Sequence, residues 1–162
     1  MKKPLMLFAC MAAIAVLVIF QSASAQGKPE GVWKITEITT TGPNARTITN
    51  PQPGLLILTK KYYSLVEIMG DKPRPDLPQR DATDAQKVAT WTPFAATSGT
   101  YEVKGTTLTA RGIVAKSPGQ MAPGNFGTID FKIEGNTLTI TIKANQAGPL
   151  ANPYTVKLTR LE

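Results

Sequence analysis

The stretch SGTYEVKGTTLTARGIVAKSPGQMAPGNFGTIDFKIEGNTLTITIK, from Ser98 to Lys143, decides the fold of this chain. It contains two hairpins, each with a glycine at the turn. In the second hairpin, apolar and polar residues alternate, the apolar ones being Ile129, Phe131 and Ile133 before Gly135-Asn136 and Leu138, Ile140 and Ile142 after it. Such period-two alternation is typical of antiparallel strands with one dry and one wet face, and a Gly-Asn pair suits a tight hairpin turn. The pattern therefore predicts a β-meander.

The remaining strands are predicted by shorter apolar runs that prolines and glycines separate. They cover residues 31–38, 55–59, 62–69 and 154–161, with proline-containing loops at 39–54, 70–80, 117–124 and 144–153. The run from Leu55 to Leu58 is apolar throughout, which indicates burial on both faces or a wall that faces an apolar ligand. We count eight sequential strands. They favour an all-β fold, an eight-stranded antiparallel up-and-down barrel whose closure leaves no exposed edge, with a seven- or eight-stranded sandwich as the alternative.

One short helix interrupts the strands. Thr83 and Gln86 have the spacing of a capping box, and we expect a helix from Asp84 to about Trp91 that Pro93 disturbs. Val88 and Trp91 would share one face of this helix. We predict that the helix covers an opening or a side of the sheet.

The start of the chain has the pattern of a secretory signal. Lys2 and Lys3 precede an uncharged run from Pro4 to Phe20, and Ala23-Ser24-Ala25 offers small residues for cleavage. We expect residues 1–25 to be removed, leaving a domain at 26–162 in a secreted, periplasmic protein that is not inserted in a membrane. An uncleaved anchor and lipidation at Cys10 are the alternatives.

The amino-acid composition limits which catalytic and metal sites the protein can form. The chain has no His, and its one Cys lies within the predicted signal. A Ser-His-Asp triad, a Cys-His pair and the usual zinc sites are therefore excluded from the mature domain, and we predict neither a metal nor a cofactor. Lys2 and Lys3 are two of the 18 basic residues, so 16 remain against 11 acidic ones. This modest excess is dispersed, which argues against nucleic-acid binding.

Several short motifs in order resemble the small bacterial lipocalin-like domains of the calycin superfamily. They are Gly31-Val32-Trp33-Lys34-Ile35, Pro53-Gly54-Leu55-Leu56, the helix before Ser98-Gly99-Thr100-Tyr101-Glu102-Val103, and Gly135-Asn136-Thr137-Leu138-Thr139. The resemblance spans residues 31–161 and implies a barrel whose apolar interior holds a small lipophilic molecule. It also implies that Trp33 packs across the closed end of the barrel, with Arg160 as its stacking partner. The disulfide and second motif of larger lipocalins are missing, so the resemblance does not give the ligand class.

Candidate ligand-binding residues come from two groups. The aromatic residues that could line a pocket are Tyr63, Trp91, Phe94, Tyr101, Phe131 and Tyr154; ordinary core packing is the competing interpretation for each. Glu67 and Arg111 would fix the polar end of a ligand if they point inward, and would simply be solvated if they point outward. A register slip of one residue would exchange these two outcomes.

Three functions follow. We expect a non-enzymatic carrier of a small hydrophobic molecule. The first alternative is a cyclase or isomerase of the calycin kind, with Glu67 and a neighbouring Tyr as acid and base. The second is an interaction protein with a solid barrel, in which the loops at 70–80 and 117–124 meet a partner.

Overall fold

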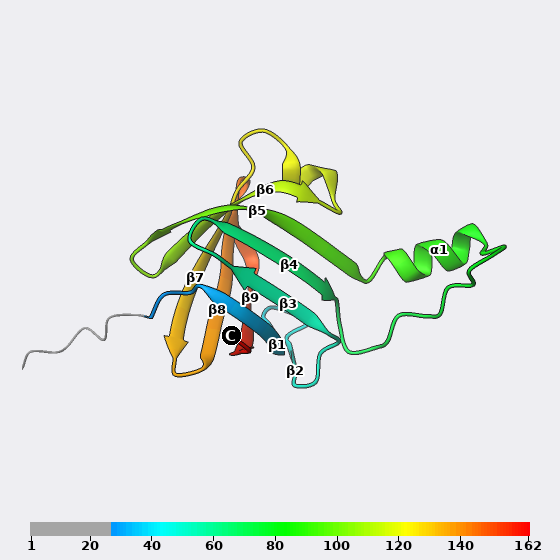
Figure 1. Ribbon diagram of the computed structural model, residues 1–162, viewed down its shortest axis with the longest axis horizontal. Helices are drawn as coiled ribbons and strands as arrows, with labels where there is room; N and C mark the ends of the chain where they lie inside the picture. The colour runs from blue at the N-terminus through cyan, green and yellow to red at the C-terminus, as the bar shows by residue number, and fades with distance from the viewer. Residues whose placement is uncertain (1–26) are drawn as a thin grey trace, which may run out of the picture.

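The computed structural model describes residues 27–162, and the predicted signal and its cleavage site lie outside them. Figure 1 shows strands curving around a common interior, with one helix set apart from them. The elements are β1 (Gly31–Thr40), β2 (Arg46–Ile48), β3 (Gly54–Leu58), β4 (Tyr62–Ile68), α1 (Asp84–Trp91), β5 (Phe94–Lys104), β6 (Thr107–Ala115), the 3-10 helix η1 (Pro118–Met121), β7 (Gly127–Glu134), β8 (Thr137–Asn145) and β9 (Gly148–Arg160).

The strands form a closed barrel. Strand β1 pairs antiparallel with β3, and each strand from β3 to β8 pairs antiparallel with the next. Strand β9 then pairs with β1, from Trp33 opposite Arg160 to Thr40 opposite Tyr154. Eight strands thus close on themselves, as the sequence predicted, and the sandwich alternative is wrong. Closure satisfies the backbone groups that an open sheet would leave at its edges.

The short strand β2 was not predicted, because it lies in the loop at 39–54. The first half of β1 pairs with β3, whereas Ile38 to Thr40 pair with β2. Ile48 is buried opposite Ile38. Three residues are too few to show an alternating pattern between the flanking prolines.

Two strands also begin earlier than their sequences suggested. β5 starts at Phe94, directly after Pro93, and β9 starts at Gly148 and contains Pro149 and Pro153. Gly148 and Pro149 pair with the end of β8, residues 150–153 fall in a register shift, and pairing with β1 begins only at Tyr154. Pro149 thus lies on a segment with one paired edge and Pro153 in an irregularity, two places where a missing N–H group is tolerated.

Two hairpin turns need a glycine at their first position. Gly105 and Gly135 have φ angles of 62° and 58°, and each is the first residue of a two-residue turn. Asn136 keeps a negative φ, so only the glycine needs the left-handed region. This is the arrangement of a type II′ turn, which matches the twist of paired strands.

The barrel has two different ends. The closed end carries the tight turns 59–61, 105–106 and 135–136 and the incoming chain at 27–30, whereas the loop end carries segments 41–53, 69–93 and 116–126. The buried core consists mainly of inward residues toward the closed end: Trp33, Ile35, Leu56, Leu58, Tyr101, Leu108, Phe131, Leu138, Val156 and Leu158. The run from Leu55 to Leu58 alternates, because Leu56 and Leu58 are buried while Leu55 and Ile57 are exposed on the outer wall.

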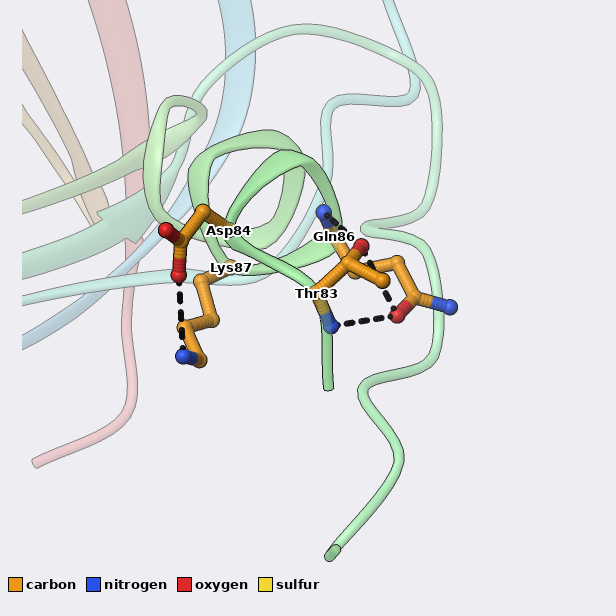
Figure 2. A network of polar contacts seen from close by, with 4 residues as sticks. All are labelled: Thr83, Asp84, Gln86 and Lys87. Atoms are coloured by element: carbon orange, nitrogen blue, oxygen red, sulfur yellow. Dashed lines mark hydrogen bonds and ion pairs between the residues drawn. The ribbon is translucent and has the colours of Figure 1, made fainter. Parts of the chain in front are cut away.

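Helix α1 has the predicted bounds and capping box. Gln86 N donates to Thr83 Oγ1 at 3.3 Å, and Thr83 N donates to Gln86 Oε1 at 2.9 Å (Figure 2). The prediction that this helix covers the barrel is wrong: none of its residues is buried, Val88 and Trp91 are 62% and 57% exposed, and the helix projects away from the strands (Figure 1). Eight residues with few apolar side chains bury too little surface to hold a helix on a sheet.

The end of α1 is nevertheless tied to the barrel. Lys116, just after β6, donates to the carbonyl oxygens of Trp91, Thr92 and Phe94 at 2.6, 3.2 and 2.7 Å. Its ammonium also lies 5.0 Å from the centroid of the Trp91 ring. A cation at the carbonyl end of a helix is favourable because the last carbonyl groups have no partner within the helix.

Candidate functional site

The inner wall of the barrel differs between its two ends. Cross-strand pairs share a face, so the pairing of Ile140 with Val156 and of Leu65 with Leu56 places all four side chains inside. Val156 and Leu56 are buried, but Ile140 and Leu65 are only partly buried. The other partly buried apolar residues that pack on the core include Ile38, Tyr63, Ala110, Ile129 and Ile142. Partly buried inward side chains are reached by solvent through the interior or at the rims of the barrel. Ile38 and Ile142 lie in the loop-end half, whereas Ile133 and Tyr63 lie nearer the closed end, where they pair with buried Leu138 and Leu58.

The closed end is sealed by Trp33 and Arg160. The Trp33 side chain is fully buried, and its Nε1 donates to the carbonyl oxygen of Pro29 at 2.8 Å. The Arg160 guanidinium lies 4.0 Å from the Trp33 ring centroid, and Nη1 donates to the carbonyl oxygen of Glu30 at 2.8 Å. The contact that the resemblance implied is therefore present. It joins β9 to β1 and to the incoming chain, which is a structural role.

Glu67 lies inside the loop end. It pairs with Gly54 and Ala95, and a Cβ atom built on Gly54 would lie 3.1 Å from the Glu67 Cβ and 2.5 Å from Cδ1 of buried Ile35. The Glu67 side chain thus leaves its strand on the same side as the core. Gly54 makes this possible, because any larger residue would collide with Ile35. Burial raises the pKa of the Glu67 carboxyl above its ordinary value.

Tyr154 and Tyr63 bring hydroxyl groups to the same interior. Tyr154 pairs with Thr40 and Ile142 on the inner face, and burial and then the charge of Glu67 raise the pKa of its phenol. The Tyr63 hydroxyl and Thr97 Oγ1 share a hydrogen bond of 3.1 Å. The interior therefore combines an apolar wall with the Glu67 carboxyl and the Tyr154 phenol toward the loop end, as is typical of small-molecule sites. The Tyr63 phenol belongs to a residue that pairs with Leu58, nearer the closed end.

The other predicted aromatic residues divide between the closed end and the exterior. Tyr101 and Phe131 belong to the buried core, and the Tyr101 hydroxyl donates to the carbonyl oxygen of Thr59. Burial, and then the charge of Glu30, raises the pKa of that phenol. Phe94 pairs with Ile68 on the outer face, and Trp91 lies on α1, with its ring centroid 6.0 Å from that of Phe94. Phe94 and Trp91 do not line the barrel interior.

Arg111 also lies outside the barrel. It pairs with Thr100, is exposed, and places its guanidinium 5.5 Å from the Phe126 ring centroid. Its neighbours Ala110 and Gly112 take the inward positions of β6, which is why the alternation excludes Arg111. Of the two charged candidates, only Glu67 faces the interior.

Two surface depressions lie elsewhere. One, of about 590 Å³, is at the closed end, where Tyr101 and Phe131 meet the charged side chains of Lys28, Lys60 and Glu102. The other, of about 320 Å³, lies between α1 and the proline-rich loop and is lined by Arg74, Leu77, Lys87, Val88, Thr90 and Trp91. Both are open to solvent, and the buried phenol of Tyr101, which lines the first, already donates to the carbonyl oxygen of Thr59. The loop-end interior is the stronger candidate.

Sequence reasoning missed the apolar part of this site. Ile38, Ile140 and Ile142 line the accessible wall, and their alternation already placed them on the dry face. The pattern could not show that they remain partly exposed, since accessibility depends on how far side chains fill the centre of a barrel.

Residues 27–162 contain no group of three or more His, Cys, Asp or Glu side chains that could hold a metal ion. Within the same residues, no helix is long and apolar enough to cross a membrane. No protein-family model, curated protein or solved structure matches this chain.

Proposed function

We propose that this protein binds a small hydrophobic molecule in the loop-end half of its barrel, as a secreted, periplasmic carrier related to the lipocalin-like calycins. The accessibility of the inward apolar side chains at that end carries the proposal. The interior of an eight-stranded barrel is either filled by side chains or just wide enough to hold one small ligand, and the partial exposure of inward residues favours the second. Burial of apolar ligand surface against Leu65, Ile140 and Ile142 would supply most of the binding free energy.

The asymmetry of the barrel supports one direction of entry. Tight turns and the Trp33–Arg160 contact block the closed end, whereas the longer connections lie at the loop end. A ligand would therefore enter between segments 41–53, 69–93 and 116–126. Its apolar end would rest on the buried layer that includes Leu56 and Val156.

Two neighbouring alanines of β5 allow a matched test. Ala95 pairs with Glu67 and faces the interior, whereas Ala96 pairs with Val66 on the outer wall. Titration with an uncharged apolar fluorophore, N-phenyl-1-naphthylamine, should show saturable binding with one site per chain. Ala95→Trp should abolish this binding by filling the site, while Ala96→Trp should leave it intact.

The proposal fails if the fluorophore does not bind saturably, or if both tryptophan variants change its binding equally. A folded-state check by circular dichroism should accompany each variant. Native mass spectrometry of the protein from its own host, followed by extraction of the retained molecule, would then identify the natural ligand.

Isomerase or cyclase activity is a second candidate, favoured by the Glu67 carboxyl and the Tyr154 phenol inside one apolar site. An acid and a base beside a bound lipid could move a proton between its carbon atoms. Recovery of a bound molecule unchanged after prolonged incubation would support the carrier over the enzyme. Loss of turnover in Glu67→Gln would support the enzyme.

A further inference from the structure

Glu67 is an inward carboxyl with no partner of its own. The ion pairs among residues 27–162 use the carboxyls of Asp84, Glu134, Asp130 and Glu37. No hydrogen bond to the Glu67 side chain is present in that part of the chain, and its charge acts on the phenol of Tyr154. Arg160, the inward cation of the closed end, is already held by Trp33 and Glu30.

Glu67 is only partly buried, and no fully buried side-chain oxygen or nitrogen of residues 27–162 lacks a partner, so water solvates this carboxyl in the empty barrel. A charged group in an apolar environment must be paired, be hydrogen-bonded or be neutralised by a proton. The other inward positions of β4 are Tyr63 and Leu65, so Glu67 is the one charged side chain on the inner face of this strand. Among residues 27–162 this inward carboxyl takes part in none of the ion pairs, so it is available to a charged group of a ligand.

From this geometry we infer the ligand class: an amphiphile with a cationic amine at one end and an alkyl or isoprenoid chain at the other. The inference rests on the proposed function. The chain would lie along Leu65, Ile140 and Ile142, and the ammonium would donate hydrogen bonds to the Glu67 carboxylate near the mouth. A charge-assisted hydrogen bond is about twice as strong as a neutral one, and the same carboxylate would repel a fatty acid.

Tyr154 strengthens this assignment. Its ring lies on the inner face of β9, on the loop-end side of Val156, and the Glu67 charge acts on its phenol. An ammonium held by Glu67 would thus lie near an aromatic ring, an arrangement in which cations are stabilised. The carboxyl and the phenol come from β4 and β9, so the head group would be held from two sides.

Three ligands with one chain and different head groups test the inference. Dodecylamine, dodecanol and dodecanoate should be compared at pH 7 by displacement of N-phenyl-1-naphthylamine, below the concentrations at which they form micelles. Dodecylamine should bind about tenfold or more tightly than dodecanol, and dodecanoate should bind most weakly. Glu67→Gln should lower the affinity for dodecylamine to that for dodecanol.

Glu102→Gln is the matched control, because Glu102 is an exposed carboxyl on the outer face of β5. The Glu102→Gln variant should bind dodecylamine more tightly than dodecanol by the same factor as the wild type does. This result would exclude a general attraction of the protein surface for cations. Equal binding of dodecylamine and dodecanol, or tightest binding of dodecanoate, would overturn the inference while leaving the carrier function intact. Failure of all three to bind would overturn both.

Discussion

The two halves of this barrel are built from the same strands but differ in how completely their inward side chains are buried. At the closed end, inward side chains such as Leu138 and Leu158 are fully buried and an arginine stacks on a tryptophan. At the loop end, Ile142 occupies the same face of the same strand as Leu138 but stays partly exposed, and the Glu67 carboxyl lies on the inner face of β4. The fully buried layer is therefore concentrated in one half, and the proposed ligand site lies in the other.

The largest loss of stability is expected from Trp33, at the closed end. Trp33→Ala removes the most deeply buried aromatic residue and the hydrogen bond to Pro29, and should lower the free energy of unfolding by about 3–5 kcal/mol. Urea denaturation measures this loss. Trp91→Ala, on the exposed face of α1, should cost less than about 0.5 kcal/mol. Equal losses of unfolding free energy for the two variants would contradict a structural role of Trp33 at the closed end that Trp91 on the exposed helix does not share.

A pair of substitutions on β8 compares the two halves directly. Leu138→Ala should cost about 3 kcal/mol, since it opens a cavity in a filled layer. Ile142→Ala should cost about 1 kcal/mol, because its side chain already borders accessible space and leaves little new cavity. Chemical denaturation of both variants provides the numbers, and a larger loss for Ile142→Ala would contradict an open loop end.

Glu67→Gln should stabilise the protein at pH 7. Burial raises the pKa of Glu67 in the folded state, so the ionised carboxylate disfavours the fold above that pKa. As pH falls below the ordinary value of 4.5, the group is protonated in both states and the difference should vanish. Denaturation midpoints of wild type and variant across this range test the sign. Lower stability of the variant at neutral pH would show that the charge is compensated.

The smallest effect is expected on the outer wall. Asp130 accepts hydrogen bonds from Lys143 and from Thr107, at 3.1 Å for the latter, and the Lys143 contact lowers the pKa of Asp130. Asp130→Asn should cost only a few tenths of a kcal/mol at pH 7, because solvent screens the pair. That stability is present above the ordinary pKa of 3.8 and is lost as pH falls through the lowered value. Thermal melts of wild type and Asp130→Asn at pH 7 and at lower pH measure this difference. A loss of stability as large as that of Leu138→Ala would contradict the small effect expected for the outer wall.

Much of the fold follows from the sequence, because the alternation from Ser98 to Lys143 fixes both face and register. The same reasoning placed Glu67 with Tyr63 and Leu65 on one face, and this is the inner one. It left Arg111 undecided, since Arg111 shares its face with Thr107, Thr109 and Ile113 and neither face of the strand is clearly apolar. The exposure of Trp91 and the approach of Tyr154 to Glu67 depend on contacts between distant segments, which local patterns do not contain.

The central claim is that the loop-end half of the interior is the part that receives a ligand. Methyl NMR spectra recorded while dodecanol is added test it directly, with signals assigned for both halves of β8 and for the outer wall. The methyl groups of Ile140, Ile142 and Leu65 should shift, while those of Leu138, Leu158 and the outward Leu55 and Ile57 should stay in place. Shifts confined to the outer wall, or none within the barrel at saturating dodecanol, would contradict the account.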